Sequence, residues 1–169
     1  MTRVVQVAPP SGSLVSEIAR SAHYEDAFLV RLPLDTFPDV DALTRACVRL
    51  PAWVGALMAV RNRLVAPFGL KTEAPPDAQR ADGRAFTQGD YAGFLRVFER
   101  RADELLLGGD DRHLDFRFSL LLRQGKASQE VFATTAVRFH NLWGRLYFFF
   151  VAPFHRLIIP AMLRHALPC

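Results

Sequence analysis

The sequence has little of several features on which common classes of protein function depend. Only Lys71 and Lys126 among its 21 basic residues are lysines, and the arginines are scattered along the chain, so no nucleic-acid partner is predicted. The two cysteines, Cys47 and Cys169, are too far apart to make a metal motif or a disulfide framework. Unpaired cysteines are typical of a reducing compartment, and a cytoplasmic location is therefore expected.

Long apolar runs are also scarce. Met1 to Ser16 has no apolar core of the length that a signal peptide needs. The most apolar run, Leu146–Phe154, is bounded by Arg145 and His155 and is much shorter than the roughly 20 residues of a membrane-spanning helix. No membrane span is therefore expected.

Reactive groupings are missing as well. No serine or cysteine nucleophile can be paired with a histidine, and no two carboxylates stand at a useful spacing. Asp110 and Asp111 follow two glycines in a turn, where adjacent carboxylates are usually solvated. No cluster of histidine or cysteine suggests a metal, so the residues predict no catalytic group, metal or cofactor.

The composition is that of a globular protein with a high phenylalanine content. A chain of 169 residues suits one domain, and 50% hydrophobic with 22% charged residues excludes wholesale disorder. The 14 phenylalanines imply either a thick aromatic core or a pocket lined with rings. We divide the chain into an N-terminal segment, 1–23, and a single domain, 24–169.

Hydrophobic periodicity predicts one strand, two helices and then an antiparallel meander. The predicted strands are Tyr24–Leu34, Phe94–Glu99, Glu104–Leu107, His113–Arg123 and Val131–Phe139, and the predicted helices are Val40–Leu50 and Ala52–Ala66. Residues 71–90 are rich in proline, aspartate, glutamine and glycine, and they form either a mobile rim or a loop with a short strand at Arg84–Phe86.

A long helix is predicted at the C-terminal end, from Leu142 to Leu167, with Asn141 as its N-cap. It is apolar nearly all round, which predicts that it is covered on most sides and has too little polar surface to lie on a membrane. Arg145 and Arg156 form a sparse polar seam. Pro153 and Pro160 predict a kink or a break, because each removes a backbone donor.

Six stretches of sequence carry a family resemblance: Pro51–Val54, Arg61–Val65, Phe68–Thr72, Asp111–Arg117, Phe139–Tyr147 and Pro153–Ile158. They resemble an uncharacterised bacterial family, a domain of unknown function with relatives fused behind NAD-binding short-chain-dehydrogenase-like domains. The order of elements resembles the α+β helix-grip superfamily of START, polyketide-cyclase and pollen-allergen-like domains. There a curved antiparallel sheet wraps around a long C-terminal helix.

The resemblance implies a cavity between sheet and helix that binds lipids, sterols, polyketides or other apolar molecules. Some members of such a superfamily are enzymes and many are carriers, so the fold alone does not choose between them. The chain has no glycine-rich phosphate loop of its own, and a dinucleotide role would need an oxidoreductase partner.

Six polar residues are candidates for ligand contact: Asp115, Arg117, His140, Arg145, Tyr147 and His155. Asp115 and Arg117 share a strand face with His113, and they either orient a ligand or form the solvent side of a half-buried strand. His140 either moves a proton or makes a structural hydrogen bond at the junction with the last helix.

The other three candidates lie on the long helix. Arg145 and Tyr147 either point a donor into the cavity or are satisfied inside the protein, for example by an ion pair of Arg145 with Asp115. His155 follows Pro153 and either anchors a ligand or bonds a carbonyl that the proline leaves free.

Three functions remain open on this basis. The first is a binding module for a small apolar or amphipathic ligand, with Arg117, Arg145, Tyr147 and His155 as polar anchors. The second is a cyclase- or aromatase-type enzyme in which His140 or His155 moves a proton. The third is an interaction domain with an interior filled by phenylalanine, which would bind no small molecule. A homodimer stays open under each of the three.

Overall fold

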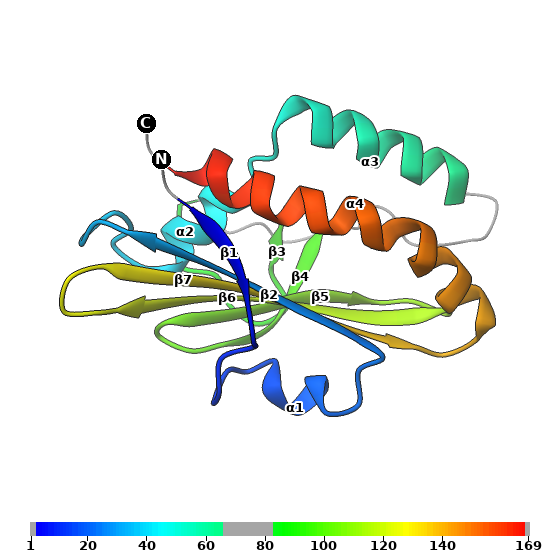
Figure 1. The fold of residues 1–169 in the computed structure, drawn as a ribbon, viewed down its shortest axis with the longest axis horizontal. Helices are drawn as coiled ribbons and strands as arrows, with labels where there is room; N and C mark the ends of the chain where they lie inside the picture. The colour runs from blue at the N-terminus through cyan, green and yellow to red at the C-terminus, as the bar shows by residue number, and fades with distance from the viewer. Residues whose placement is uncertain (1–2, 66–82, 168–169) are drawn as a thin grey trace.

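An antiparallel sheet of seven strands is the frame of the protein in the computed structural model, which describes residues 3–65 and 83–167 (Figure 1). The strand order is β1-β2-β7-β6-β5-β4-β3, and every neighbouring pair is antiparallel. The strands are β1 (Val4–Val7), β2 (Tyr24–Leu32), β3 (Tyr91–Ala92), β4 (Leu95–Arg100), β5 (Glu104–Asp110), β6 (Leu114–Gln124) and β7 (Gln129–Phe139). The predicted α+β class with an antiparallel meander is confirmed.

The helices lie on both sides of this sheet. The short helix α1 (Ser16–Ala19) covers one side, and α2 (Val40–Cys47), α3 (Ala52–Val65) and α4 (Leu142–Ala166) lie on the other (Figure 1). Asp39 caps α2, since its side chain accepts a hydrogen bond from the Ala42 amide. Asn141 caps α4 in the same way through the Gly144 amide at 3.0 Å, as predicted.

The long helix α4 is continuous through both of its prolines. Of the predicted kink or break, the break is therefore excluded, and Figure 1 shows the axis curving toward the sheet at its N-terminal end. Packing on either side of Pro153 explains the continuity, because Phe148 and Ile159 are both anchored in buried clusters. A helix held at two points bends at a proline without ending there.

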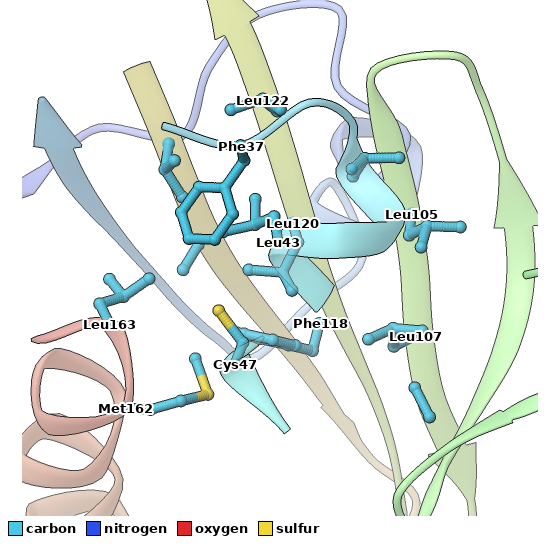
Figure 2. Packing of buried hydrophobic residues seen from close by; sticks show 14 of the residues in the cluster. Phe37, Leu43, Cys47, Leu105, Leu107, Phe118, Leu120, Leu122, Met162 and Leu163 are labelled. Carbon is cyan, nitrogen blue, oxygen red and sulfur yellow. The ribbon is translucent and has the colours of Figure 1, made fainter. Parts of the chain in front are cut away.

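The main core lies between the sheet, α2 and the last turns of α4 (Figure 2). Side chains alternate along a strand, so Phe118, Leu120 and Leu122 of β6 all face this layer, as the sequence predicts. Met162 and Leu163 of α4 and Leu43 and Cys47 of α2 belong to the same buried cluster as these strand residues. Burial raises the pKa of the Cys47 thiol to about 12, which keeps it protonated and inert.

The opposite side of the sheet, here called the outer face, holds a smaller core under α1. Leu14 and Val15 pack against Leu106 of β5 and Ala136 of β7. The buried carboxylate of Glu104 holds this segment, because it accepts hydrogen bonds from the Leu14 amide and from the hydroxyls of Ser13 and Ser119. Three donors converge on one carboxyl group, which offsets the cost of burying it.

Two parts of the sheet differ from the sequence prediction. β1 lies in the N-terminal segment and pairs with β2, and β3 is a two-residue strand beside β4. Arg84–Phe86 is not a strand: Phe86 donates its amide to Asp41, and Arg84 pairs with Asp90. Of the expected loop at 71–90, residues 71–82 lie outside the described residues.

The prediction that α4 is covered on most sides is wrong. Only 22% of its most apolar window is buried, and its outward side faces solvent. In the described part of the chain, α4 alone is long and apolar enough to cross a membrane, while α2 and α3 pass that test only as a pair bent by 70°. One such helix is weak evidence for a span, and the last turns of α4 are built into the core.

Candidate functional site

A polar cluster lies beneath the middle of α4, between two apolar regions of the interface with the sheet. It consists of Tyr24, Asp26, Thr135, His155 and Arg156, here called the Asp26 cluster. Asp26 of β2 is directly opposite Thr135 of β7 in the sheet. Both side chains point toward α4, since they share the strand faces of core residues such as Phe28 and Ala133.

The Asp26 carboxylate is the centre of the cluster. Its Oδ2 accepts a hydrogen bond from the Tyr24 hydroxyl at 2.6 Å and lies 3.3 Å from Nδ1 of His155. The other ring nitrogen of His155, Nε2, lies 3.3 Å from the Thr135 hydroxyl. The imidazole therefore lies between a buried carboxylate and a buried hydroxyl group.

The environment of the cluster lowers the pKa of Asp26 and raises the pKa of Tyr24. Burial of Asp26 would raise its pKa, but the neighbouring imidazole of His155, with the hydroxyl groups of Tyr24 and Thr135, holds it below its usual range. Burial, and then the hydrogen bond to Asp26, raise the pKa of Tyr24 to about 12. At neutral pH the cluster thus contains an anionic carboxylate and a protonated phenol.

Hydrogen bonding in the cluster is incomplete. Within the described ranges, the buried atoms Asp26 Oδ1 and His155 Nδ1 have no hydrogen-bond partner, since the 3.3 Å contact of Nδ1 lacks hydrogen-bond geometry. An unsatisfied buried polar atom costs about 1–3 kcal/mol. Such atoms are rare in folded proteins, and they are the groups that a bound molecule can satisfy.

The burial of the sheet-facing side chains differs along α4, and this determines where solvent can approach the cluster. The sheet-facing positions Gly144 and Phe148 near the helix start are buried, and so are Ile159, Met162 and Leu163 near its end. The positions between them, Val151, Ala152 and His155, are only half-buried. The helix is therefore closed on the sheet at both ends and more open in the middle, where His155 lies.

Aromatic rings border the open stretch on the side toward the start of α4. The Tyr24 ring packs against Phe148 with centroids 4.6 Å apart, and Phe148 packs against Phe139 at 5.5 Å. Arg156 reaches over the edge of the cluster, where its Nε donates to the Tyr24 hydroxyl at 3.4 Å. The surroundings are thus mostly apolar, with one anion and one exposed cation at the rim.

The six candidates from the sequence fall into three places. Asp115 and Arg117 lie on the outer face, away from α4, where Arg117 pairs with Asp110 and lies over the Phe98 ring. His140 is beside them, and its Nε2 lies 2.9 Å from Oδ2 of Asp115. Arg145 is exposed on α4, so the suggested ion pair between Arg145 and Asp115 is replaced by the pair with His140.

Tyr147 and His155 are the two candidates on the sheet side or flank of α4. The Tyr147 hydroxyl accepts a hydrogen bond from Arg61 of α3 at 2.6 Å, so it links the two helices. His155 joins the Asp26 cluster instead of bonding a carbonyl that Pro153 leaves free. The structure therefore separates His155 from the other five candidates.

Sequence reasoning missed Tyr24, Asp26 and Thr135. A signal was present in β2, because Tyr24, Asp26, Phe28 and Val30 alternate along the strand and Asp26 is the only charge on that apolar side. Thr135 gives no comparable signal in a strand rich in threonine and valine. Among the described residues, no group of three or more histidine, cysteine, aspartate or glutamate side chains could hold a metal.

Comparisons with known proteins place the chain in a family. No curated protein and no solved structure matches it. Residues 18–162 match the family described as Protein of unknown function (DUF2867), which covers the sheet from β2 onward and most of α4. The match extends over most of the chain, and the protein therefore belongs to the DUF2867 family.

Proposed function

We propose that this domain binds a small amphipathic molecule between α4 and the sheet, with the Asp26 cluster as its polar anchor. The observation that carries the proposal is the combination of a half-buried stretch in the middle of α4 with a buried, partly unsatisfied carboxylate beneath it. Ligand sites in proteins are mostly apolar with a few convergent polar groups. The helix-grip resemblance supports the same location, and the buried thiol of Cys47 suits a reducing cytoplasm.

The chemistry of the cluster restricts the ligand. Asp26 is anionic at neutral pH and keeps a free acceptor oxygen, so it favours a hydroxyl or an amine donor on the ligand. Tyr24, Phe139 and Phe148 offer flat apolar surfaces beside that anchor. A sterol-like or polyketide-like molecule with one hydroxyl fits this set, whereas a ligand with a carboxylate head would meet the like charge of Asp26.

A binding assay with matched variants tests this proposal. Purified protein is examined by native mass spectrometry for a co-purified molecule and titrated with hydroxylated and carboxylated apolar compounds. Asp26→Asn should weaken binding of the hydroxylated compounds about tenfold or more, because a hydrogen bond to a charged group contributes roughly 1.5–3 kcal/mol. Asp115→Asn, on the outer face, is the control and should leave binding unchanged.

Two results would contradict the proposal. One is the absence of any co-purified or titrated apolar ligand, which favours an interior that is simply filled. The other is equal binding by the protein and by Asp26→Asn, which places the ligand elsewhere.

A cyclase- or aromatase-type enzyme is the second candidate. It is favoured by the position of the His155 ring, which lies within 3.3 Å of both a carboxylate and a hydroxyl oxygen. A carboxylate beside an imidazole orients the ring, so His155 is placed to exchange a proton with a bound molecule. His155→Gln separates the two functions: an enzyme loses turnover and keeps ligand binding, whereas a carrier has no turnover to lose.

A further inference from the structure

The helices α3 and α4 share an apolar surface that no described element covers. Nine of the eleven exposed large hydrophobic residues in the described chain lie on α3 and α4. Phe149 is 72% exposed, Phe150 63% and Trp143 60%. Soluble proteins rarely expose so many large apolar side chains together. Where they do, the exposed apolar patch commonly marks an interaction site.

The exposed residues of α4 lie along one side of the helix. At about 100° per residue they fall opposite the residues that pack on the sheet, such as Phe148 and Met162. The set on this side, here called the apolar face, comprises Leu142, Trp143, Leu146, Phe149, Phe150, Phe154 and Leu157. The helix thus has two apolar sides, one buried in the protein and one turned outward.

The helix α3 extends this surface. It lies beside α4 in Figure 1, and Arg61 joins it to Tyr147 through the hydrogen bond and by stacking over the ring at 5.5 Å. Trp53 and Val60 of α3 are also exposed, at 51% and 57%. Trp53 of α3 and Trp143 of α4 are the two tryptophans of the chain, and both are exposed.

Charge on the two helices has a single sign. They contain five arginines, Arg61, Arg63, Arg145, Arg156 and Arg164, and no aspartate or glutamate. Of the chain's 21 basic and 17 acidic residues, the remainder of the chain therefore holds 16 basic and all 17 acidic ones. The formal charge of +4 thus comes entirely from α3 and α4.

We propose that the surface formed by α3 and the apolar face of α4 docks the protein onto the anionic surface of a phospholipid bilayer. Helices that lie in a membrane interface combine an apolar side, tryptophan and arginine, and they are attracted to anionic lipids. The arginine stems lie along apolar groups while the guanidinium groups reach the lipid phosphates. The sheet supplies the polar side, which an isolated α4 lacks.

The geometry favours docking over spanning. Phe148, Ile159, Met162 and Leu163 fix one side of α4 in the protein core, so α4 cannot enter a bilayer alone. The charges also argue against a second copy as the occupant, since two such surfaces would bring ten arginines together without a carboxylate from either helix pair. This inference does not rest on the proposed ligand site beneath α4.

Vesicle binding by the whole chain tests the proposal. The protein is mixed with vesicles of phosphatidylcholine alone, or of equal parts phosphatidylcholine and phosphatidylglycerol, and is then sedimented. We expect binding to the anionic vesicles, weakened by added salt, with a blue shift of tryptophan emission. The emission reports on α3 and α4, because each helix carries one of the two tryptophans of the chain and both are exposed.

Two pairs of variants separate apolar from charge contributions. Phe149→Ser with Phe150→Ser should reduce vesicle binding about tenfold or more, whereas Leu34→Ser, an exposed position in the turn after β2, should not. Arg145→Glu should weaken binding to anionic vesicles, and Arg138→Glu, on the outer face of β7, should have a much smaller effect. All five positions are exposed, so we expect the variants to fold.

Three outcomes would overturn the inference. The first is no sedimentation with anionic vesicles. The second is equal binding by the protein and by the Phe149→Ser, Phe150→Ser variant. The third is a dimer in analytical ultracentrifugation that this double variant converts to a monomer without a change in vesicle binding, which would assign the surface to a second copy.

Discussion

At the scale of single residues, the start of α4 depends on Gly144. This position approaches the loop before β6 so closely that a Cβ atom would overlap the carbonyl oxygen of His113. That contact is with backbone, which cannot swing aside as a flexible side chain can. The same loop binds the helix cap, since the Asn141 side chain contacts the His113 ring and the Arg112 carbonyl. The lack of a side chain at Gly144 therefore allows the first turn of α4 to pack directly against the loop before β6.

Replacement of Gly144 by alanine should destabilise the protein, by about 1–3 kcal/mol or more, because the helix start must move away from His113. Gly55→Ala in α3 is the matched control, since nothing lies within 4 Å of its Cβ position. Alanine favours a helix over glycine, so this control should be neutral or stabilising by up to about 1 kcal/mol. Urea unfolding measures both, and equal stability of the two variants would contradict the packing argument.

Asp26 shows what a sequence can reveal about a single residue. Its place in an alternating strand makes the buried charge visible in advance, but its partners His155 and Thr135 are 129 and 109 positions away. The contact with His155 depends on the height and rotation of α4 above the sheet. Neither quantity follows from periodicity, which gives the side of an element but not the neighbour that it meets.

At the scale of elements, an ion pair joins α2 to β4 and to the segment before β3. The carboxylate of Asp41 accepts two hydrogen bonds from Arg100, at 2.7 and 2.9 Å, and one from the Phe86 amide at 2.7 Å. Burial would raise the pKa of Asp41, but the hydrogen bond and charge of Arg100, with the Phe86 amide, hold it below its usual range. Phe86 is thereby placed in the main core.

Asp41→Asn should therefore destabilise the protein at neutral pH by about 1–2 kcal/mol, allowing for the partial exposure of Arg100. Since the folded-state pKa is lowered, this contribution is complete above the unfolded pKa of about 4 and is lost as pH falls through the folded-state value. The difference between variant and wild type should thus shrink below about pH 4.

Urea unfolding at pH 7 and at successively lower pH measures this difference. Asp103→Asn removes an exposed carboxylate and should change stability little at any pH. A constant penalty for Asp41→Asn down to the acid limit would show that its charge is not what stabilises the contact.

The elements also show where sequence prediction ends. The alternation of β6 and the cap of α4 are local features, and both were predicted correctly. The exposure of α4 was not, because an apolar sequence predicts burial and does not reveal which of its residues remain exposed. Which sides of α4 are covered depends on how the helix packs against the sheet and beside α3.

At the scale of the whole molecule, the N-terminal segment is part of the sheet structure. β1 pairs with β2 along four residues at the sheet edge, and Val5 and Val7 pack against Leu29 and Phe132 on the outer face. The Glu104 carboxylate then fixes Leu14, and α1 covers Leu106. The boundary drawn from sequence at residue 24 thus divides segments that share buried clusters.

Removal of residues 1–23 should therefore severely destabilise the remaining domain. The truncation exposes the edge of β2 and uncovers both outer-face clusters, and each large apolar side chain that loses its burial costs about 1.5–3 kcal/mol. Several such losses approach the total stability of a typical domain, roughly 5–15 kcal/mol. Circular dichroism and thermal unfolding should show a truncated chain that is largely unfolded or aggregated.

Leu14→Ala removes part of only one cluster and should lower the unfolding midpoint without loss of fold. A truncated chain with an unchanged midpoint would instead establish residues 24–169 as an independent unit, with β1 and α1 as dispensable additions.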